Sequence, residues 1–102
     1  MFLLNTTFHV ENSLIEEFLT WIKEIYIPEA MSSGLLKNPK LSRILIEVDP
    51  AATSYAMQFN ADTIEQASLW HDEIGAELRG QLSRRWPERI VFFTTYMENM
   101  PL

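Results

Sequence analysis

The stretch that most restricts the fold of this chain is residues 13–34, SLIEEFLTWIKEIYIPEAMSSG. Ser13 and Glu16 have the S-x-x-E spacing of a capping box, which predicts that a helix begins here. Pro28 predicts that this helix ends, or restarts as a short turn, and Gly34 predicts a left-handed stop. We therefore expect one capped helix, around which the strands and a second helix pack.

At 100° per residue, this first helix has two adjacent apolar stripes. They comprise Leu14, Phe18, Trp21 and Ile25 in the first stripe, and Ile15, Leu19, Ile22 and Tyr26 in the second. One stripe is enough for a sheet contact, so we expect the first to face the sheet. The second stripe then needs the other helix, the turn after Pro28, or a neighbouring subunit.

The rest of the chain contains four strand-like segments and one more helical segment. The predicted strands are residues 2–10, 41–48, 54–60 and 89–97. The second helix begins near Thr63, which forms a box-like pair with Gln66, and closes at Trp86 and Pro87. Its expected apolar stripe consists of Ile64, Ala67, His71, Ile74, Leu78 and Leu82, with Trp70 at the edge.

The order of these elements is β-α-β-β-α-β, which predicts one α+β domain over residues 1–102 with the ferredoxin-like arrangement. Right-handed crossovers put both helices on one face of a four-stranded antiparallel sheet, with the first and third strands central. The last strand is apolar on both faces, so the other sheet face would expose a substantial patch. Pairing of two copies, sheet to sheet, is the simplest remedy and predicts a homodimer.

Composition excludes several classes of protein. The formal net charge of −6 argues against nucleic acid as the main partner, because phosphate contacts need clustered Lys and Arg. The chain has no cysteine, which excludes disulfides and thiolate chemistry and fits a reducing compartment. No signal peptide and no apolar run of about 20 residues is found. We predict a cytoplasmic protein without a membrane partner.

Several segments together carry a family resemblance. They are the W-x-x-x-x-x-I-P-x-x-M-x-x-G run at residues 21–34, the opening strand, the hairpin aromatics Tyr55 and Phe59, residues 77–79, and the closing run at 91–95. The chain resembles the dimeric α/β-barrel superfamily and, within it, an uncharacterised bacterial family of short proteins labelled as a domain of unknown function. That resemblance implies a fold and a dimer, but no activity. Its relatives often carry a histidine where this chain has Tyr26.

His71 is the candidate catalytic residue, because it lies on the stripe that should face the sheet. The small residues Ala67, Ser68 and Gly75 lie within one turn of it and could leave a pocket for a small organic ligand. The other interpretation is a core histidine held by one hydrogen bond. The predicted ligand-binding residues are Asn5, His9, Tyr55, Trp70 and His71.

A polar row on the first strand comprises Asn5, Thr7 and His9, and we expect it to lie opposite Ser54, Ala56 and Gln58. Such groups would suit a hydrated dimer interior or a face that binds a ligand, since buried polar atoms need partners. They would equally suit structural hydrogen bonds between two copies. The sequence leaves open which face of the sheet this row occupies.

We predict no cofactor and no metal. The two histidines are far apart and no H-x-x-x-H motif is present. Phosphate-loop, dinucleotide and serine-nucleophile signatures are also absent. Asn5, Trp70 and His71 superficially resemble the Asn, Trp and His trio of haem-degrading relatives, but Trp70 and His71 are adjacent whereas that trio is well spaced. Haem binding is therefore not predicted.

Three functions remain open. The first is a homodimeric module that binds a small organic ligand or a protein partner. The second is a cofactor-independent enzyme, similar to a monooxygenase or an isomerase, with His71 as an acid–base group. The third is a purely structural interaction role. A cavity that brings His71 together with Tyr or Trp side chains would favour the enzyme, and a filled core would favour the interaction module.

Overall fold

The computed structural model describes residues 1–46 and 49–102 of the chain. Its strands are β1 (Phe2–Glu11), β2 (Lys37–Arg43), β3 (Ala52–Ala61) and β4 (Ile90–Glu98). Within the described residues they form one antiparallel sheet in the order β2-β3-β1-β4. The prediction that the first and third strands are central is confirmed.

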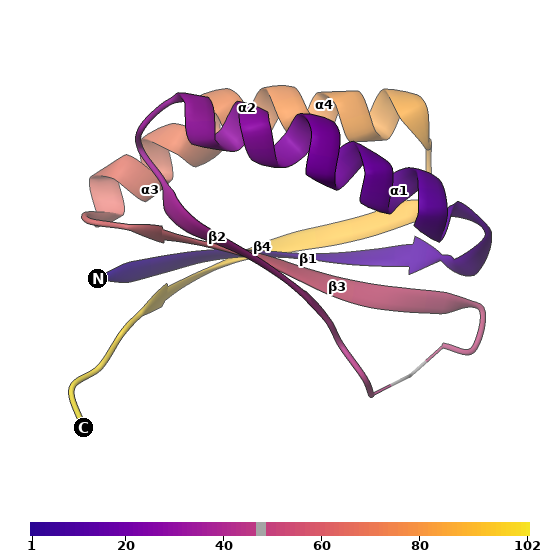
Figure 1. The fold of residues 1–102 in the computed structure, drawn as a ribbon, viewed down its shortest axis with the longest axis horizontal. Helices are drawn as coiled ribbons and strands as arrows, with labels where there is room; N and C mark the ends of the chain where they lie inside the picture. The colour runs from indigo at the N-terminus through magenta and orange to yellow at the C-terminus, as the bar shows by residue number, and fades with distance from the viewer. Residues whose placement is uncertain (47–48) are drawn as a thin grey trace.

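Two helical rods cover one face of this sheet (Figure 1). The first rod contains the 3-10 turn η1 (Asn12–Leu14), α1 (Ile15–Trp21), the π-helical turn η2 (Ile22–Tyr26) and α2 (Ile27–Ser32). The second contains α3 (Ile64–Trp70), the π-helical turn η3 (His71–Gly75) and α4 (Ala76–Arg85). This is the predicted ferredoxin-like α+β arrangement, with both helices on the same side.

The π-helical turn η2 changes which side chains of the first rod reach the core. A π turn holds more residues than an α turn, so later side chains are rotated about the helix axis. Ile22 and Tyr26 are consequently buried, although they belong to the second predicted stripe, while Ile25 of the first stripe is only half-buried. Pro28 does not end the helix, because it lies in the first turn of α2, where its missing N–H is tolerated.

The second rod also departs from its predicted stripe. Trp70 is fully buried, so its predicted place at the edge of the stripe was wrong. His71, the next residue, is only half-buried, and Ile64 at the start of the rod is exposed. The core of this rod is formed by Trp70 together with Ala67, Leu78 and Leu82, which belong to the predicted stripe.

The helix ends confirm two predicted signals and correct one. Thr63 Oγ1 accepts a hydrogen bond of 3.1 Å from the Gln66 N–H, as a helix N-cap does. Gly34 has a φ of 73°, the left-handed stop. The capping box at Ser13 was wrong, because Ser13 Oγ accepts from Arg89 Nη2 at 3.1 Å and caps no helix.

β2 begins and ends earlier than the predicted strand at 41–48. Residues 44–46 lie beyond its end and are exposed, and residues 47 and 48 fall outside the described part of the chain. The pairing with β3 is irregular between Lys37 and Lys40, where Asn38 has a φ of 52° and precedes Pro39. This bulge lets the strand continue back to Lys37 despite the proline.

The two faces of the sheet differ sharply. The covered face carries Leu4, Phe8, Val10, Tyr55, Met57, Phe59 and Ile90, all buried beneath the helices. On the opposite face, Val91 and Phe93 of β4 are 63% and 61% exposed. We call this second surface the uncovered face; Figure 1 shows it free of helices below the sheet.

Candidate functional site

Three polar side chains meet where the second helical rod passes over the edge strand β4. Arg79 Nη1 lies 3.0 Å from His71 Nδ1, and Arg79 Nη2 donates a hydrogen bond of 3.1 Å to the His71 carbonyl oxygen. The rings of His71 and Tyr96 meet edge to face, with centroids 5.8 Å apart. We call His71, Arg79 and Tyr96 the edge cluster.

The edge cluster depends on Gly75, which ends the π-helical turn. A Cβ atom at this position would lie 2.9 Å from Arg79 Nη1 and 2.9 Å from a ring carbon of Trp70. Glycine therefore leaves the space through which the Arg79 side chain reaches back toward the start of its helix. Without that space the guanidinium could not lie beside the His71 ring.

The hydrogen bond from Arg79 decides which ring nitrogen of His71 carries the proton. A guanidinium only donates, so Nδ1 must accept and the neutral ring carries its proton on Nε2. Burial lowers the pKa of His71, and the charge of Arg79 lowers it further, against the opposing effect of Asp72. At neutral pH, His71 thus offers an N–H donor beside a guanidinium.

Tyr96 completes the edge cluster as a neutral phenol. Burial raises the pKa of its hydroxyl, and the nearby Asp72 carboxylate raises it further, while Arg79 and a hydrogen bond with Ser68 act in the other direction. The ring remains 40% exposed, so its face and hydroxyl are accessible at the molecular edge. The edge cluster therefore presents donors to solvent and no ionised carboxylate of its own.

Three polar side chains, Tyr26, Thr6 and Thr94, lie together under the helices. Tyr26 is buried, which raises the pKa of its hydroxyl to about 12, although a hydrogen bond with Thr6 and the charge of Arg79 oppose the shift. Thr6 Oγ1 in turn lies 3.4 Å from Thr94 Oγ1 on β4. Tyr26 stands where the resembling relatives often carry a histidine, so this chain holds a neutral phenol at that position.

The predicted site residues fall in three separate places. Tyr55 and Trp70 are buried in the helix–sheet core, and His71 lies at the edge. Asn5 and His9 lie on the uncovered face, where they pair with Gln58 and Ser54 as predicted. Asn5 is nevertheless mostly buried among its neighbours, and its Oδ1 has no hydrogen-bond partner among the described residues.

Sequence reasoning did not single out Arg79, Tyr96 or Asp49 as site residues. Arg79 lies eight positions after His71, a spacing that a regular helix would separate by about 12 Å. Tyr96 and Thr94 share a face of β4, which alternation alone could have indicated. The contact of Asp49 with His9 depends on the tertiary fold.

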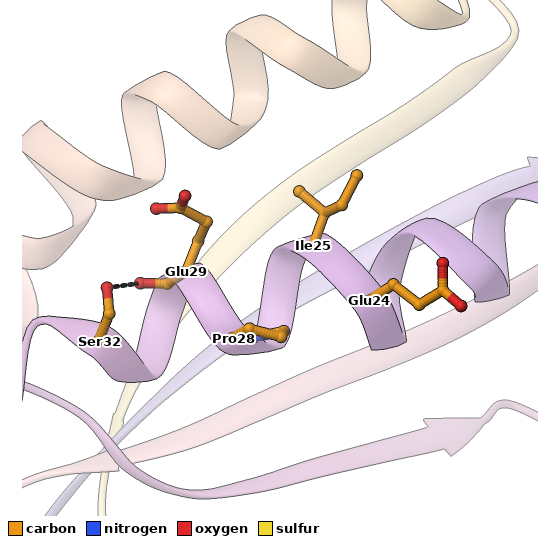
Figure 2. Close-up of a pocket in the computed structure, with 5 residues that line it drawn as sticks. All are labelled: Glu24, Ile25, Pro28, Glu29 and Ser32. Carbon is orange, nitrogen blue, oxygen red and sulfur yellow. Dashed lines mark hydrogen bonds between the residues drawn. The ribbon is translucent and has the colours of Figure 1, made fainter.

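Two surface hollows lie on the helices, away from these residues. One, of about 260 Å³, is lined by Glu24, Ile25, Pro28, Glu29 and Ser32 (Figure 2), where Ser32 Oγ donates to the Glu29 carbonyl oxygen at 2.7 Å. The other, of about 330 Å³, is lined by Ser13, Glu16, Glu17, Thr20 and Arg85. Neither hollow includes a predicted site residue.

Residues 1–46 and 49–102 contain no group of three or more His, Cys, Asp or Glu side chains placed to hold a metal ion. No helix among the described elements has both the length and the apolar character needed to cross a bilayer.

The fold and its two sheet faces define a ferredoxin-like α+β protein, and solved structures share this architecture. A protein from Deinococcus radiodurans, provisionally described as an antibiotic biosynthesis monooxygenase, has a TM-score of 0.71 and 11% identity, covering 100% of this chain and 95% of its own. Protein Atu4242 from Agrobacterium tumefaciens has a TM-score of 0.68 and 16% identity, and the match covers 98% of this chain and 94% of the other. A dimeric ferredoxin-like protein from an uncultured marine organism has a TM-score of 0.67 and 17% identity, and the match covers 98% of this chain and 96% of the other.

The family of the chain is shown by sequence. Residues 1–100 match the model of DUF4286, a domain of unknown function, so the chain belongs to the DUF4286 family. A search of curated proteins finds no match. The predicted membership of a family of unknown function is thereby confirmed.

Proposed function

We propose that this protein is a homodimeric binding module, in which two copies pack their uncovered faces together. The observation that carries the proposal is the exposure of Val91 and Phe93, at 63% and 61%, on the face opposite the helices. Fully burying a side chain of this kind contributes about 1.5–3 kcal/mol. A two-fold contact would bury both side chains of both copies.

Three further observations support this assembly. The exposed apolar residues 44–46 follow β2, which adds apolar surface near the sheet. A second copy could supply the donor that Asn5 Oδ1 lacks. Two structural neighbours from uncultured marine organisms, at 17% and 14% identity, are described as dimeric ferredoxin-like proteins.

The edge cluster is the part of this module that we expect to bind a small organic ligand. Arg79 has no carboxylate within salt-bridge distance in the described part of the chain. A half-buried guanidinium without a counter-ion, beside the Nε2–H of His71 and the Tyr96 hydroxyl, suits a ligand with an acidic group. Because Tyr55 and Trp70 are packed into the core, the ligand would bind at the edge.

An enzymatic function is the second candidate, and the protonation of His71 is the observation that favours it. A neutral imidazole with one free N–H beside a phenol can exchange protons with a bound substrate. The enzyme would be a cofactor-independent monooxygenase or isomerase, and the neighbour from Deinococcus radiodurans supports this class at the level of fold. The packed core ranks it behind the binding module.

We keep the cytoplasmic location as a prediction that the cysteine-free sequence supports.

Sedimentation of the Phe93→Glu variant tests the dimer. We expect the wild type to sediment as a dimer at micromolar concentration and Phe93→Glu as a folded monomer, because a carboxylate would have to be buried at the contact. Leu69→Glu is the matched control, since Leu69 is 46% exposed on the helical side and should not affect assembly. A monomeric wild type would overturn the proposal.

Titration with benzoate, followed by NMR of backbone amides, tests the ligand site. We expect shifts around the edge cluster in the wild type and none in Arg79→Gln at the same concentration. Shifts that are the same in both proteins would refute the assignment of this site.

A further inference from the structure

A serine, a histidine and an aspartate form a hydrogen-bonded relay on the uncovered face. His9 Nδ1 lies 2.9 Å from Ser54 Oγ, and His9 Nε2 lies 3.4 Å from Asp49 Oδ2. The register of β1 and β3 places His9 directly opposite Ser54. The turn that leads into β3 brings Asp49 to the other side of the imidazole.

The chemistry of the three groups sets the direction of this relay. An ionised carboxylate only accepts hydrogen bonds, so His9 Nε2 must carry the proton that faces Asp49. The neutral ring then has a free lone pair on Nδ1, and the Ser54 hydroxyl is the donor to it. This is the arrangement in which a histidine can remove the proton of a serine.

Asp49 is held in place by its own turn. Its Oδ1 accepts a hydrogen bond of 2.9 Å from the Ala51 N–H, which leaves Oδ2 for His9. The bond from Ala51 lowers the pKa of Asp49, and the bond from His9 lowers it further, so the carboxylate is ionised at neutral pH. Asp49 is therefore suited to fix the orientation and the tautomer of His9.

We propose that Ser54 is a nucleophilic serine that accepts acyl groups from small esters, with His9 as its general base and Asp49 as the positioning residue. In this step Ser54 Oγ forms a bond to the acyl carbon while its proton moves to His9 Nδ1. The bond from the acyl carbon to the leaving oxygen breaks, and that oxygen takes the proton from His9. Water then hydrolyses the acyl-serine by the reverse sequence of proton transfers.

The surroundings of Ser54 indicate which esters can react. Its same-face neighbours along β3 are Ala52 and Ala56, whose side chains are small, so we expect small acyl groups to react. Ser54 lies within a paired strand, where backbone N–H groups serve the sheet, so we expect slow turnover and a visible acyl-serine with activated esters. The relay is complete within one chain and does not rest on the proposed dimer.

Acylation by p-nitrophenyl acetate, followed by intact-protein mass spectrometry and peptide mapping, tests the proposal. We expect one acetyl group per chain, located on Ser54, and none in Ser54→Ala. His9→Ala should lower the acylation rate on the order of 10²- to 10⁴-fold, and added imidazole should restore part of it. Asp49→Asn should react more slowly than wild type, and Asp49→Glu should recover part of the loss.

Two controls keep the result decisive. Ser42→Ala removes an exposed serine of β2 and should be acylated like the wild type. The second control is the same reaction on Phe93→Glu. We expect this variant to be monomeric, so a second copy cannot shield Ser54 on the uncovered face. Acetylation at a residue other than Ser54, or no acetylation in both wild type and Phe93→Glu, would overturn the proposal.

Discussion

The indole Nε1 of Trp70 donates a hydrogen bond of 3.2 Å to the carbonyl oxygen of Ala30, and this bond ties the two helical rods together. Both residues are buried, and the Trp70 ring also packs against Tyr26 and Phe59. The bond therefore holds the end of α3 against α2, next to the π-helical turn that carries His71. The position of the edge cluster depends on this contact between the helices.

Replacing Trp70 with Phe should destabilise the protein. The smaller ring leaves a cavity and the Ala30 carbonyl loses its bond from the indole, so we expect a loss of about 2–4 kcal/mol. Urea unfolding measures it. Trp86→Phe is a useful comparison, because its indole donates to the partly solvated Glu17 carboxylate and should cost less. Equal losses would contradict the role given to the bond between Trp70 and Ala30.

Gly75→Ala should separate the effect on the edge cluster from the effect on helix propensity. The new methyl group would press on the buried Trp70 ring and displace Arg79 from His71, so we expect a net loss of about 1 kcal/mol. At Gly80 the nearest group is the mobile end of Arg84, 3.2 Å away, so Gly80→Ala should instead gain up to about 1 kcal/mol. Thermal unfolding of both variants gives the comparison, and a stabilised Gly75→Ala would disprove the close approach.

The buried phenol of Tyr26 should make the protein sensitive to alkaline pH. Its folded pKa of about 12 is higher than the ordinary tyrosine pKa of 10.0, so the unfolded chain loses this proton first as pH rises. Stability present below pH 10 should fall by up to roughly 3 kcal/mol as pH approaches 12. Tyr26→Phe should remove this part of the fall in unfolding free energy between pH 10 and pH 12. Denaturant unfolding of both proteins at several alkaline pH values measures this difference. If wild type and Tyr26→Phe lost stability equally with rising pH, the hydroxyl would be solvated and the prediction wrong.

His71 should add a dependence on acidic pH. Its folded pKa is lower than the ordinary histidine pKa of 6.5, so the unfolded chain binds this proton first as pH falls. Stability should therefore be independent of this group above pH 6.5 and decrease below it, down to the folded pKa. Comparing the pH dependence of unfolding in wild type and His71→Gln isolates the effect. A pKa of His71 at or above 6.5, measured by NMR titration of the ring in the folded protein, would contradict this prediction.

The two predicted helix caps give a matched pair of variants. Thr63→Ala removes a side-chain bond to the Gln66 N–H and should cost about 1 kcal/mol. Ser13→Ala removes only an exposed contact with Arg89 and should change stability by no more than about 0.5 kcal/mol. Urea unfolding of the two proteins compares them directly. A larger loss for Ser13→Ala would mean that Ser13 caps a helix in solution.

The topology of the sheet could be predicted from the sequence because it depends on the order and type of its elements. Period-two alternation identified β1 and β3, and the apolar run at 89–97 identified β4, each to within two residues. The second strand was predicted at 41–48, too late in the chain. The apolar residues 44–46, which favoured that prediction, lie beyond the end of β2, whereas the charged residues Lys37, Lys40 and Arg43 lie within β2. Short edge strands are paired along one side only, so their composition carries little information.

The candidate site was harder to predict, because it depends on how the second helical rod packs and on contacts between residues that are distant in the sequence. A helix assumed to have 100° per residue places His71 toward the sheet and Trp70 at the edge, and the structure reverses them. The composition of residues 71–75 does not mark a π turn. Contacts such as those of Arg79 with His71, and of Asp49 with His9, follow only from the three-dimensional fold.

The bulged outer strand has a consequence for how far assembly can proceed. β2 forms one border of the sheet, and along it lie Lys37, Lys40 and Arg43, with Pro39 between the lysines. Like charges and a proline discourage another strand from pairing there, as does the irregular register. Sheet growth by strand addition is thus disfavoured at this border, while face-to-face contact remains available. Association of this kind closes on itself at a small, finite size and does not extend into fibres.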